Sequence, residues 1–280
     1  MIEKMTSSSP IGIFDSGVGG LSVLRVIRQQ LPHESILYLA DQIHVPYGKR
    51  SLTEVREFSN EITQFLLKAG AKLIIVACNT ASAAALHDLR IKFPETKFVG
   101  MEPAVKPAAE ISLTRRVGVL ATSATFQGAL YSSVVERFAK DVTLYQQTCN
   151  GLVEQIEAGD LVSHKTRHIL ETALVPMVEK GIDTIVLGCT HYPFVISMIK
   201  EIVGDGIRVI DPAPAVARQV EKLLHVGLMR NVDKKTISMN FFTTGDPVEF
   251  KKKLPALIFE TGDVSKLVWL ENSLKSGGRN

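Results

Sequence analysis

Short apolar runs alternate along this chain with segments in which apolar residues recur at helical spacing. The runs are rich in valine, isoleucine and leucine and mostly lack strict apolar-polar alternation, which is typical of strands buried on both faces of a parallel sheet. The intervening segments resemble the stretch with Leu21, Leu24, Ile27 and Leu31, where one helical face is apolar. The pattern therefore predicts an α/β fold. The expected strands are 11–14, 36–40, 73–77, 97–100, 117–120, 142–146, 184–187, 207–210 and 238–243.

The two halves of this pattern look like copies of one unit. Similar segments recur in the same order, and their offset grows slowly from 106 residues (117 − 11) to 111 residues (189 − 78). A drifting offset is typical of a duplicated domain with small insertions, and the alternative is convergence of ordinary strand-helix patterns. The matched segments are 11–16 with 117–122, 36–38 with 143–145, 101–104 with 210–213, and Cys78 with Cys189.

Proline marks two points where the chain is expected to cross between domains. Glu102-Pro103 and Asp211-Pro212 each follow an expected strand, and proline disfavours helix in the preceding residue. We therefore predict a first α/β domain from 1–102 plus 212–280 and a second from 103–211. The last segment is too short for a third domain, so its one expected strand returns to complete the first. The predicted architecture is two pseudo-symmetric parallel-sheet α/β domains with the active site between them.

Composition and charge exclude several classes of protein. The chain is 45% hydrophobic and 22% charged, its net charge is only +3, and no apolar run approaches the roughly 18 residues of a membrane helix. The run Lys251-Lys252-Lys253 is interpreted as a solvated helix face, and residues 1–10 contain no apolar signal core. We expect a cytoplasmic protein that binds neither nucleic acid nor membrane.

Two of the three cysteines lie in matching contexts. Cys78 and Cys189 each follow an apolar run and precede residues suited to begin a helix, whereas Cys149 has no counterpart and is interpreted as structural or incidental. Three cysteines cannot all pair within one chain, so free thiols are expected. Helix amino-terminal amides lower a thiol's pKa, so both matching thiols are expected to ionise readily; the alternative is that each is a small buried apolar residue. Two such thiols could remove a proton from one face of a carbon and return it to the other.

Other polar groups follow the expected strands and allow competing interpretations. The glycine-rich turn after Asp15, with Asp41 as a ribose acid, suggests a dinucleotide site, but Ser22 stands where the third glycine is required. The turn could equally hold a carboxylate. Zinc at Cys189 and His191 with Cys78 or Cys149 lacks regular ligand spacing, so His191 is better interpreted as a general acid or base, or as the group that poises a nearby thiol.

Several motifs together resemble the glutamate racemase family of the aspartate/glutamate racemase superfamily. They are 15–24, 46–48, 77–80, 102–104, 187–193 and 242–245, which run in order along nearly the whole chain. The resemblance implies an isomerase that uses no cofactor, has two pseudo-symmetric α/β domains, and supplies D-glutamate for peptidoglycan. No metal is expected, because no ligand cluster in the sequence suggests one. Remaining alternatives are another racemase of the superfamily, such as one for aspartate, and a nucleotide-binding or regulatory module that keeps only the fold.

The resemblance also implies roles for particular residues. Cys78 would act on D-glutamate and Cys189 on L-glutamate, assisted by Asp15 and His191. By its spacing from Cys189, Glu157 fits the family's helper glutamate better than Glu154, although Asn150 stands where proline is common. The only small-molecule partner expected is glutamate; a homodimer is left open. The implied substrate contacts are Asp15, Ser16, Tyr47, Gly48, Asn79, Thr80, Thr122, Thr125, Thr190 and His191.

Overall fold

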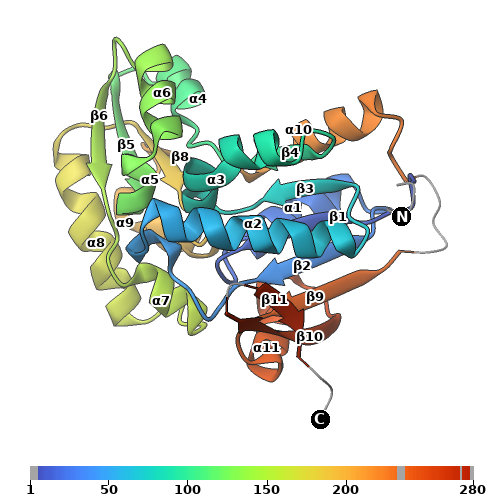
Figure 1. The fold of residues 1–280 in the computed structure, drawn as a ribbon. Helices are drawn as coiled ribbons and strands as arrows, with labels where there is room; N and C mark the ends of the chain where they lie inside the picture. Colours follow the sequence, from blue (N-terminus) through green and yellow to red (C-terminus); the bar gives the residue numbers. More distant parts are fainter. Residues whose placement is uncertain (1–5, 232–236, 272, 278–280) are drawn as a thin grey trace.

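The computed structural model describes residues 6–231, 237–271 and 273–277, which form two sheets flanked by helices (Figure 1). The first sheet has the strand order β11-β10-β9-β2-β1-β3-β4, and the second has the order β6-β5-β7-β8. All pairings are parallel except that of β10 with β11. The strands are β1 (Ile11–Asp15), β2 (Ile36–Ala40), β3 (Leu73–Val76), β4 (Lys97–Gly100), β5 (Arg116–Ala121), β6 (Thr143–Gln147), β7 (Thr184–Gly188), β8 (Arg208–Ile210), β9 (Met239–Thr243), β10 (Asp263–Leu270) and β11 (Ser273–Ser276).

Helices cover both faces of each sheet. On the first sheet, α2 and α3 lie on one face, and α1, α10 and α11 lie on the other (Figure 1). On the second sheet, α4 and α6 pack on one face, and α8 and α9 on the other. The helices are α1 (Leu21–Gln30), η1 (Tyr47–Lys49), α2 (Leu52–Lys68), α3 (Asn79–Lys92), α4 (Val105–Ile111), α5 (Ser123–Gln127), α6 (Ala129–Phe138), α7 (Leu152–Glu157), α8 (His164–Glu179), η2 (Tyr192–Val195), α9 (Ile196–Val203), α10 (Ala213–Val226) and α11 (Pro247–Ile258).

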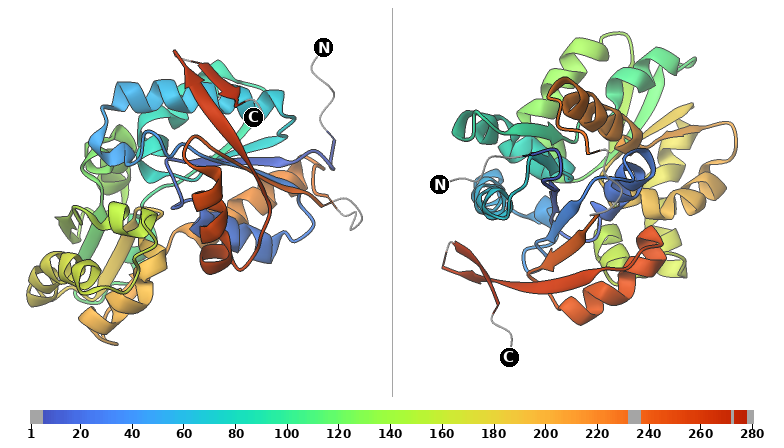
Figure 2. Two further views of the ribbon diagram at one scale, coloured as in Figure 1. Left: turned by 90° about the horizontal axis from the view of Figure 1, so that it is seen from below. Right: turned by 90° about the vertical axis from the view of Figure 1, so that its right-hand side faces the viewer.

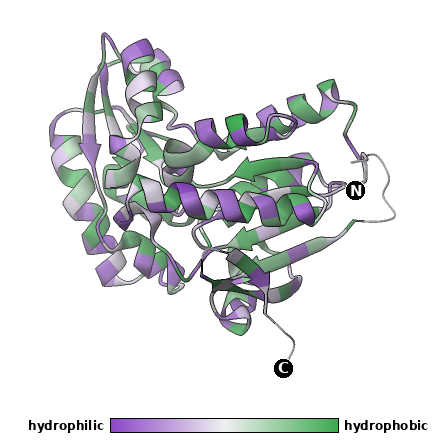
Figure 3. Cartoon of the chain, in the orientation of Figure 1, coloured by the Kyte–Doolittle hydropathy of each residue, from purple (hydrophilic) through white to green (hydrophobic). Residues whose placement is uncertain are grey.

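The central strands are buried on both sides, as the continuous apolar runs predicted. Every residue of β1 is buried, with Ile11 and Ile13 facing α1 and α10 while Phe14 packs with α2 and α3. Figure 3 shows hydrophobic strands inside and hydrophilic residues on the outer helix faces. The α/β prediction is confirmed, and each of the nine expected strands agrees with an observed strand to within one residue at either end.

The expectation of a single strand after position 212 is wrong. β9 returns to the first sheet beside β2, but β10 and β11 extend the sheet beyond it. The apolar pattern did not reveal β10 because Leu267 is its only fully buried residue, while Asp263 and Ser265 alternate with partly buried positions. A strand near a sheet edge buries too little surface to need an apolar run.

Two connections join the sheets, one between β4 and α4 and one between β8 and α10. The predicted crossing points near 102 and 211 lie in these connections, and Figure 2 shows the two sheets in separate lobes. We propose 1–102 plus 212–280 and 103–211 as the two domains. This arrangement brings the carboxyl ends of both sheets to the same region.

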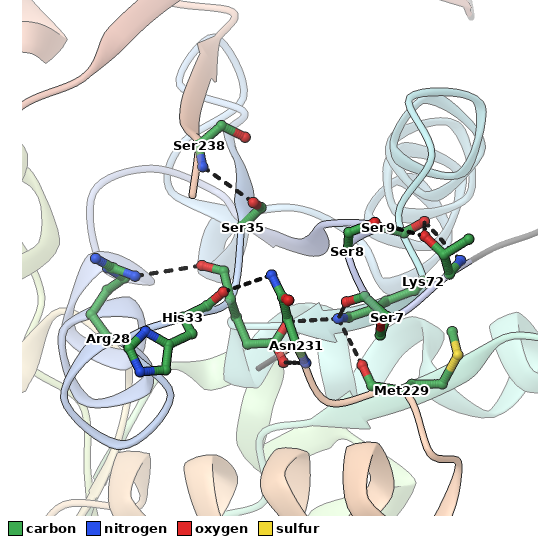
Figure 4. A network of polar contacts seen from close by, with 12 residues as sticks. Ser7, Ser8, Ser9, Arg28, His33, Ser35, Lys72, Met229, Asn231 and Ser238 are labelled. Atoms are coloured by element: carbon green, nitrogen blue, oxygen red, sulfur yellow. Dashed lines mark hydrogen bonds and ion pairs between the residues drawn. The ribbon is translucent and has the colours of Figure 1, made fainter. Parts of the chain in front are cut away.

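A buried ion pair anchors the chain where it leaves α10 for β9. Lys72 Nζ lies 2.6 Å from Glu34 Oε2, and both side chains are at most 1% exposed. Lys72 also donates to the carbonyl of Met229 at 2.8 Å, and the backbone N–H of Asn231 donates to Glu34 Oε1 at 2.8 Å (Figure 4). Buried charges persist when they are paired and fully hydrogen-bonded, so this cluster holds the returning segment against the first sheet.

Candidate active site

A small cavity lies between the carboxyl ends of the two sheets. Asp15 ends β1, Cys78 follows β3, and Cys189 follows β7, so the parallel strands of both sheets deliver these side chains to one region. The cavity has a free volume of ≈ 10 Å³, about the space of one water molecule. It is lined by Ser16, Pro46, Tyr47, Gly48, Cys78, Asn79, Thr80, Thr122, Val153, Gly188, Cys189, Thr190 and His191.

Cys78 occupies the N-cap position of α3 and is only 6% exposed. Its sulfur accepts a hydrogen bond from the backbone N–H of Ala81 at 3.5 Å, as expected at a helix amino terminus. Burial, followed by the negative charge of Asp15, nevertheless raises the pKa of Cys78 well above 9.0. The expectation that the helix terminus would make this thiol ionise readily is therefore wrong, because loss of solvation outweighs the amide contact.

Asp15 is fully buried beside Cys78, and its carboxylate is held by the glycine-rich turn. Its Oδ2 accepts from the backbone N–H of Gly20 at 2.9 Å and of Gly17 at 3.2 Å, whereas Oδ1 has no hydrogen-bond partner among the described residues. Burial raises the pKa of Asp15 above 3.8, although His191 and the amide contacts oppose this rise. Asp15 is thus held beside Cys78 by the turn, although it does not itself line the cavity.

Cys189, His191 and Glu157 form a chain of contacts on the opposite side. His191 Nδ1 lies 3.8 Å from Cys189 Sγ, and His191 Nε2 lies 2.7 Å from Glu157 Oε1. Burial lowers the pKa of His191, but Cys189 and Glu157 together outweigh it and raise this pKa well above 6.5. For Glu157, burial by itself raises the pKa, but the hydrogen bond and charge of His191 outweigh burial and lower this pKa below 4.5. Both directions favour an imidazolium-carboxylate pair beside Cys189.

The glycine-rich turn serves carboxylates of the protein itself. The backbone N–H of Val18 donates to Glu157 Oε1 at 2.7 Å, so Glu157 at the end of α7 joins Asp15 on this turn. A Cβ atom on Gly17 would lie 1.8 Å from Glu157 Oε1, and one on Gly19 would lie 2.4 Å from His191 Nδ1. The dinucleotide interpretation fails here for two reasons. The amides of the turn already bind Asp15 and Glu157, and Asp41 is fully buried with its carboxylate hydrogen-bonded within the protein.

The expected substrate-binding hydroxyls meet across the two sheets. Thr80 Oγ1 lies 2.9 Å from Thr122 Oγ1, and Thr125 Oγ1 lies 3.0 Å from the latter, although Thr125 does not itself line the cavity. Asn79 is 3% exposed, and neither its oxygen nor its nitrogen has a hydrogen-bond partner among the described residues. A buried, unpaired amide is costly, so Asn79 is suited to bind a polar ligand.

The other predicted contacts also reach the cavity, but some of their polar groups are already engaged. Tyr47 donates its hydroxyl to Asp41 Oδ2 at 2.7 Å, and the backbone carbonyl of Thr190 accepts from the Ser22 hydroxyl at 2.8 Å. Gly48 packs so closely on the second sheet that a Cβ there would lie 2.7 Å from Thr122 Cβ. Ser16 lines the cavity as expected.

The structure separates the two candidate helper glutamates. Glu157 contacts His191 and the glycine-rich turn, whereas Glu154 forms an exposed ion pair with Lys49 at the rim. Cys149 lies outside the cavity lining, and burial raises its pKa to about 12. All three cysteines are free thiols, as expected.

Sequence reasoning missed Gln42, whose side-chain amide donates to Glu157 Oε2 at 3.0 Å across the two sheets. It also missed Ser22, which was noted only as a departure from a glycine motif. The single available signal was that Gln42 follows β2, at the same sheet edge as the predicted residues.

A second, larger cavity lies away from the site, and the described residues hold no metal-ligand cluster and no membrane-spanning helix. The second cavity, ≈ 510 Å³, lies among α3, β4, α6 and α10 and contains none of the predicted site residues. No cluster of three or more His, Cys, Asp or Glu residues within 6–231, 237–271 and 273–277 could hold a metal ion. Over the same ranges, no helix combines the length and apolar character needed to cross a bilayer.

Known proteins resemble this chain over nearly its full length. A model of the Asp/Glu/Hydantoin racemase family matches residues 11–220. Glutamate racemase from Pseudomonas paraeruginosa is 49% identical over 260 residues, which cover 93% of this chain and 98% of that protein. The chain belongs to the glutamate racemase family. A second relative, from Roseiflexus sp., is 51% identical over 87% of this chain and 90% of its own length.

Solved structures of the family share the fold. Escherichia coli glutamate racemase, in complex with L-glutamate and an activator, UDP-MurNAc-Ala, superposes with a TM-score of 0.83 at 31% identity, covering 94% of this chain and 99% of that one. The Francisella tularensis enzyme in complex with D-glutamate gives 0.82 at 28% identity, covering 93% and 97%. The family resemblance drawn from the motifs, and with it the assignment as an isomerase, is confirmed.

Proposed function

We propose that the protein interconverts L- and D-glutamate without a cofactor, using Cys78 and Cys189 as opposed acid and base. The observation that carries this proposal is that two thiols, one following a strand of each sheet, line a single small cavity. In each turnover one cysteine, as thiolate, takes the α-proton. The electron pair left on the α-carbon takes a proton from the thiol of the other cysteine, so configuration inverts and no oxidant or reductant is needed.

The surroundings of the two thiols differ in charge and support different roles for them. The imidazolium of His191, held by Glu157, lies beside Cys189, with Nδ1 3.8 Å from the sulfur. Burial and the Asp15 carboxylate keep Cys78 as the neutral thiol. We infer that Cys189 removes the proton of L-glutamate while Cys78 delivers one to the other face. For D-glutamate the roles reverse, with Asp15 assisting Cys78.

Polar groups around the cavity support binding of an amino acid. Asn79, Thr80, Thr122 and Thr190 bring an unpaired amide and hydroxyl groups to the walls, which suit carboxylate oxygens and an ammonium group. We infer that these groups, together with Ser16 and Gly48, hold the substrate. A cavity of ≈ 10 Å³ is far too small for glutamate, so the sheets must separate to admit it. Closing again would exclude water and strengthen electrostatic stabilisation of the carbanion.

Glutamate is proposed as the substrate because relatives from Escherichia coli and Francisella tularensis hold L-glutamate and D-glutamate. Aspartate is the alternative substrate, and comparing inversion of L-glutamate with that of L-aspartate separates the two. The product D-glutamate would serve peptidoglycan synthesis, which is consistent with the expected cytoplasmic location.

The decisive experiment replaces each thiol in turn. Cys78→Ala and Cys189→Ala should each abolish racemisation of L-glutamate and of D-glutamate, because neither thiol reaches the other face of the α-carbon. Cys149→Ala is the matched control, since that thiol is buried outside the cavity lining. Circular dichroism follows inversion of configuration and also checks the fold. Near wild-type turnover in either single variant, or inversion of L-aspartate in preference to L-glutamate, would contradict the proposal.

A further inference from the structure

A buried threonine pair at the end of β9 lies behind the site and has no role in the proposed mechanism. Thr243 and Thr244 are 0% and 3% exposed and belong to the turn 242–245, one of the family motifs. Neither residue lines the cavity. Lys266 of β10 donates to the backbone carbonyls of Thr244 and Gly245, which closes the turn from the neighbouring strand.

Hydrogen bonds through Asp41 connect Thr244 to the Tyr47-Gly48 turn, which lines one wall of the cavity. The Thr244 hydroxyl accepts from the backbone N–H of Ile43 and donates to Asp41 Oδ1, both at 3.0 Å. Trp269 Nε1 donates to the same Asp41 oxygen at 2.8 Å, while the hydroxyl of Tyr47 donates to Oδ2 at 2.7 Å. The Asp41 carboxylate therefore connects the carboxyl-terminal strands to the turn that lines the cavity.

Hydrogen bonds through Gln42 connect Thr243 to Glu157 and His191, on the wall of the cavity that carries Cys189. The Thr243 hydroxyl donates to Gln42 Oε1 at 2.8 Å and accepts from the backbone N–H of Gly245 at 2.9 Å. With its oxygen held this way, the Gln42 amide is oriented so that its nitrogen donates to Glu157 Oε2 at 3.0 Å. Glu157 in turn binds His191 beside Cys189.

We propose that Thr243 and Thr244 are positioning residues of the active site, each serving one wall. Thr244 orients the Tyr47-Gly48 turn through Asp41 and so determines substrate binding. Thr243 orients Glu157 and His191 through Gln42 and so determines proton transfer at Cys189. This inference rests on the proposed racemase function and extends it to a segment more than 50 residues beyond Cys189 in sequence (243 − 189).

The choice of residue type supports this inference. Valine has the shape of threonine and would fill a fully buried site without desolvating a hydroxyl, so packing alone does not require threonine here. Each hydroxyl instead donates to a named side-chain oxygen and accepts from a backbone N–H, which uses its donor and one acceptor position. Removing it would leave Asp41 or Gln42 with a missing donor in a buried setting.

The test compares valine and serine at both positions, with steady-state kinetics in both directions. Thr244→Val should raise KM for both enantiomers about tenfold with kcat nearly unchanged, the loss expected for one hydrogen bond to a charged group. Thr243→Val should lower kcat about tenfold with KM nearly unchanged. Thr243→Ser and Thr244→Ser keep the hydroxyl and should stay close to wild type, which separates hydrogen bonding from packing.

The outcomes distinguish this inference from the proposed function. Wild-type protein that does not racemise glutamate would defeat the proposed function itself. An active wild type whose valine variants keep both constants, or whose serine variants lose as much as the valine variants, would overturn the positioning role. Should a valine variant fail to fold, Trp269→Phe removes the other donor to Asp41 Oδ1 and so weakens the hold on Asp41, and Gln42→Leu breaks the link from Thr243 to Glu157. They should reproduce the rise in KM and the fall in kcat respectively; unchanged constants would again overturn the inference.

Discussion

At the scale of single residues, the two thiols show that a shared position does not give a shared environment. Both follow a buried strand at the carboxyl edge of a parallel sheet, yet Asp15 accompanies Cys78 while His191 accompanies Cys189. An anion therefore lies beside Cys78 and a cation beside Cys189, so the two sulfurs differ in electrostatic environment. The asymmetry suits a pair in which one member must give a proton while the other takes one.

The raised pKa of His191 predicts a pH dependence of stability. Its pKa in the folded protein is well above 6.5, its value in the unfolded chain, so the folded state binds the proton more tightly. The resulting stabilisation is fully present below pH 6.5 and is lost as the pH rises through the folded pKa. Between pH 6.5 and 8.5 the free energy of unfolding should therefore fall more steeply for wild type than for His191→Gln.

Urea unfolding at several pH values measures this difference. Glu157→Gln should flatten the slope as well, because it removes the partner that favours the imidazolium. A wild-type slope equal to that of both variants would show that the imidazolium-carboxylate pair does not form.

The sequence predicted the location of a site residue where that residue directly follows a single strand. Asp15, Cys78 and Cys189 follow apolar runs, so their meeting at the sheet edge followed from the parallel arrangement alone. Gln42 and Ser22 were not predictable, because their partners lie 115 and 168 residues away across the two sheets. The pKa of Cys78 was also missed, since the sequence shows a helix terminus but not how deeply it is buried.

At the scale of elements, the glycine-rich turn between β1 and α1 shows why glycine is needed there. The second sheet places Glu157 and His191 directly against the turn, so side chains on Gly17 and Gly19 would occupy the space of these two groups. The same glycines suggested a nucleotide site from sequence, because close approach to any carboxylate or phosphate has the same requirement. Only the fold distinguishes an internal carboxylate from a ligand.

Gly17→Ala is expected to lower kcat/KM about a hundredfold, the effect of displacing a catalytic group by about an ångström. Its new Cβ would lie 1.8 Å from Glu157 Oε1, so Glu157 must leave Val18 and shift away from His191. Gly206→Ala is the matched control, because no atom lies within 4 Å of a Cβ built there, and it should keep wild-type activity. Steady-state kinetics decide the matter, and equal activity of the two variants would contradict this account.

The strands themselves were predictable where burial is complete and not where it is partial. Continuous apolar runs marked the inner strands, whereas β10 carries one fully buried residue in eight and produced no such run. This strand nevertheless supplies Trp269, which donates to Asp41 behind the cavity. A segment with a weak sequence signal thus contributes directly to the surroundings of the site.

At the scale of the whole molecule, the Lys72–Glu34 pair lies at the amino end of β3, opposite the edge that carries the site. Lys72→Met should reduce the free energy of unfolding by about 3–5 kcal/mol, because it leaves a buried carboxylate without its partner. Turnover at low temperature should be unchanged. Denaturant titration measures the loss, and the double variant Lys72→Met/Glu34→Leu should recover part of it. A single variant as stable as wild type would show that the pair does not anchor the segment after α10.

The small size of the cavity has a consequence for how successive turnovers are connected. On the proposed mechanism, one inversion of L-glutamate leaves Cys189 protonated and Cys78 ionised, the state suited to the reverse reaction. With space for only about one water between the thiols, these protons equilibrate with solvent mainly while the sheets are apart. The protein would therefore carry a protonation memory of the enantiomer it last released. At saturating substrate the open state is brief. The proton exchange that returns the two thiols to their starting protonation states, rather than breaking of the carbon-hydrogen bond, would then limit the rate.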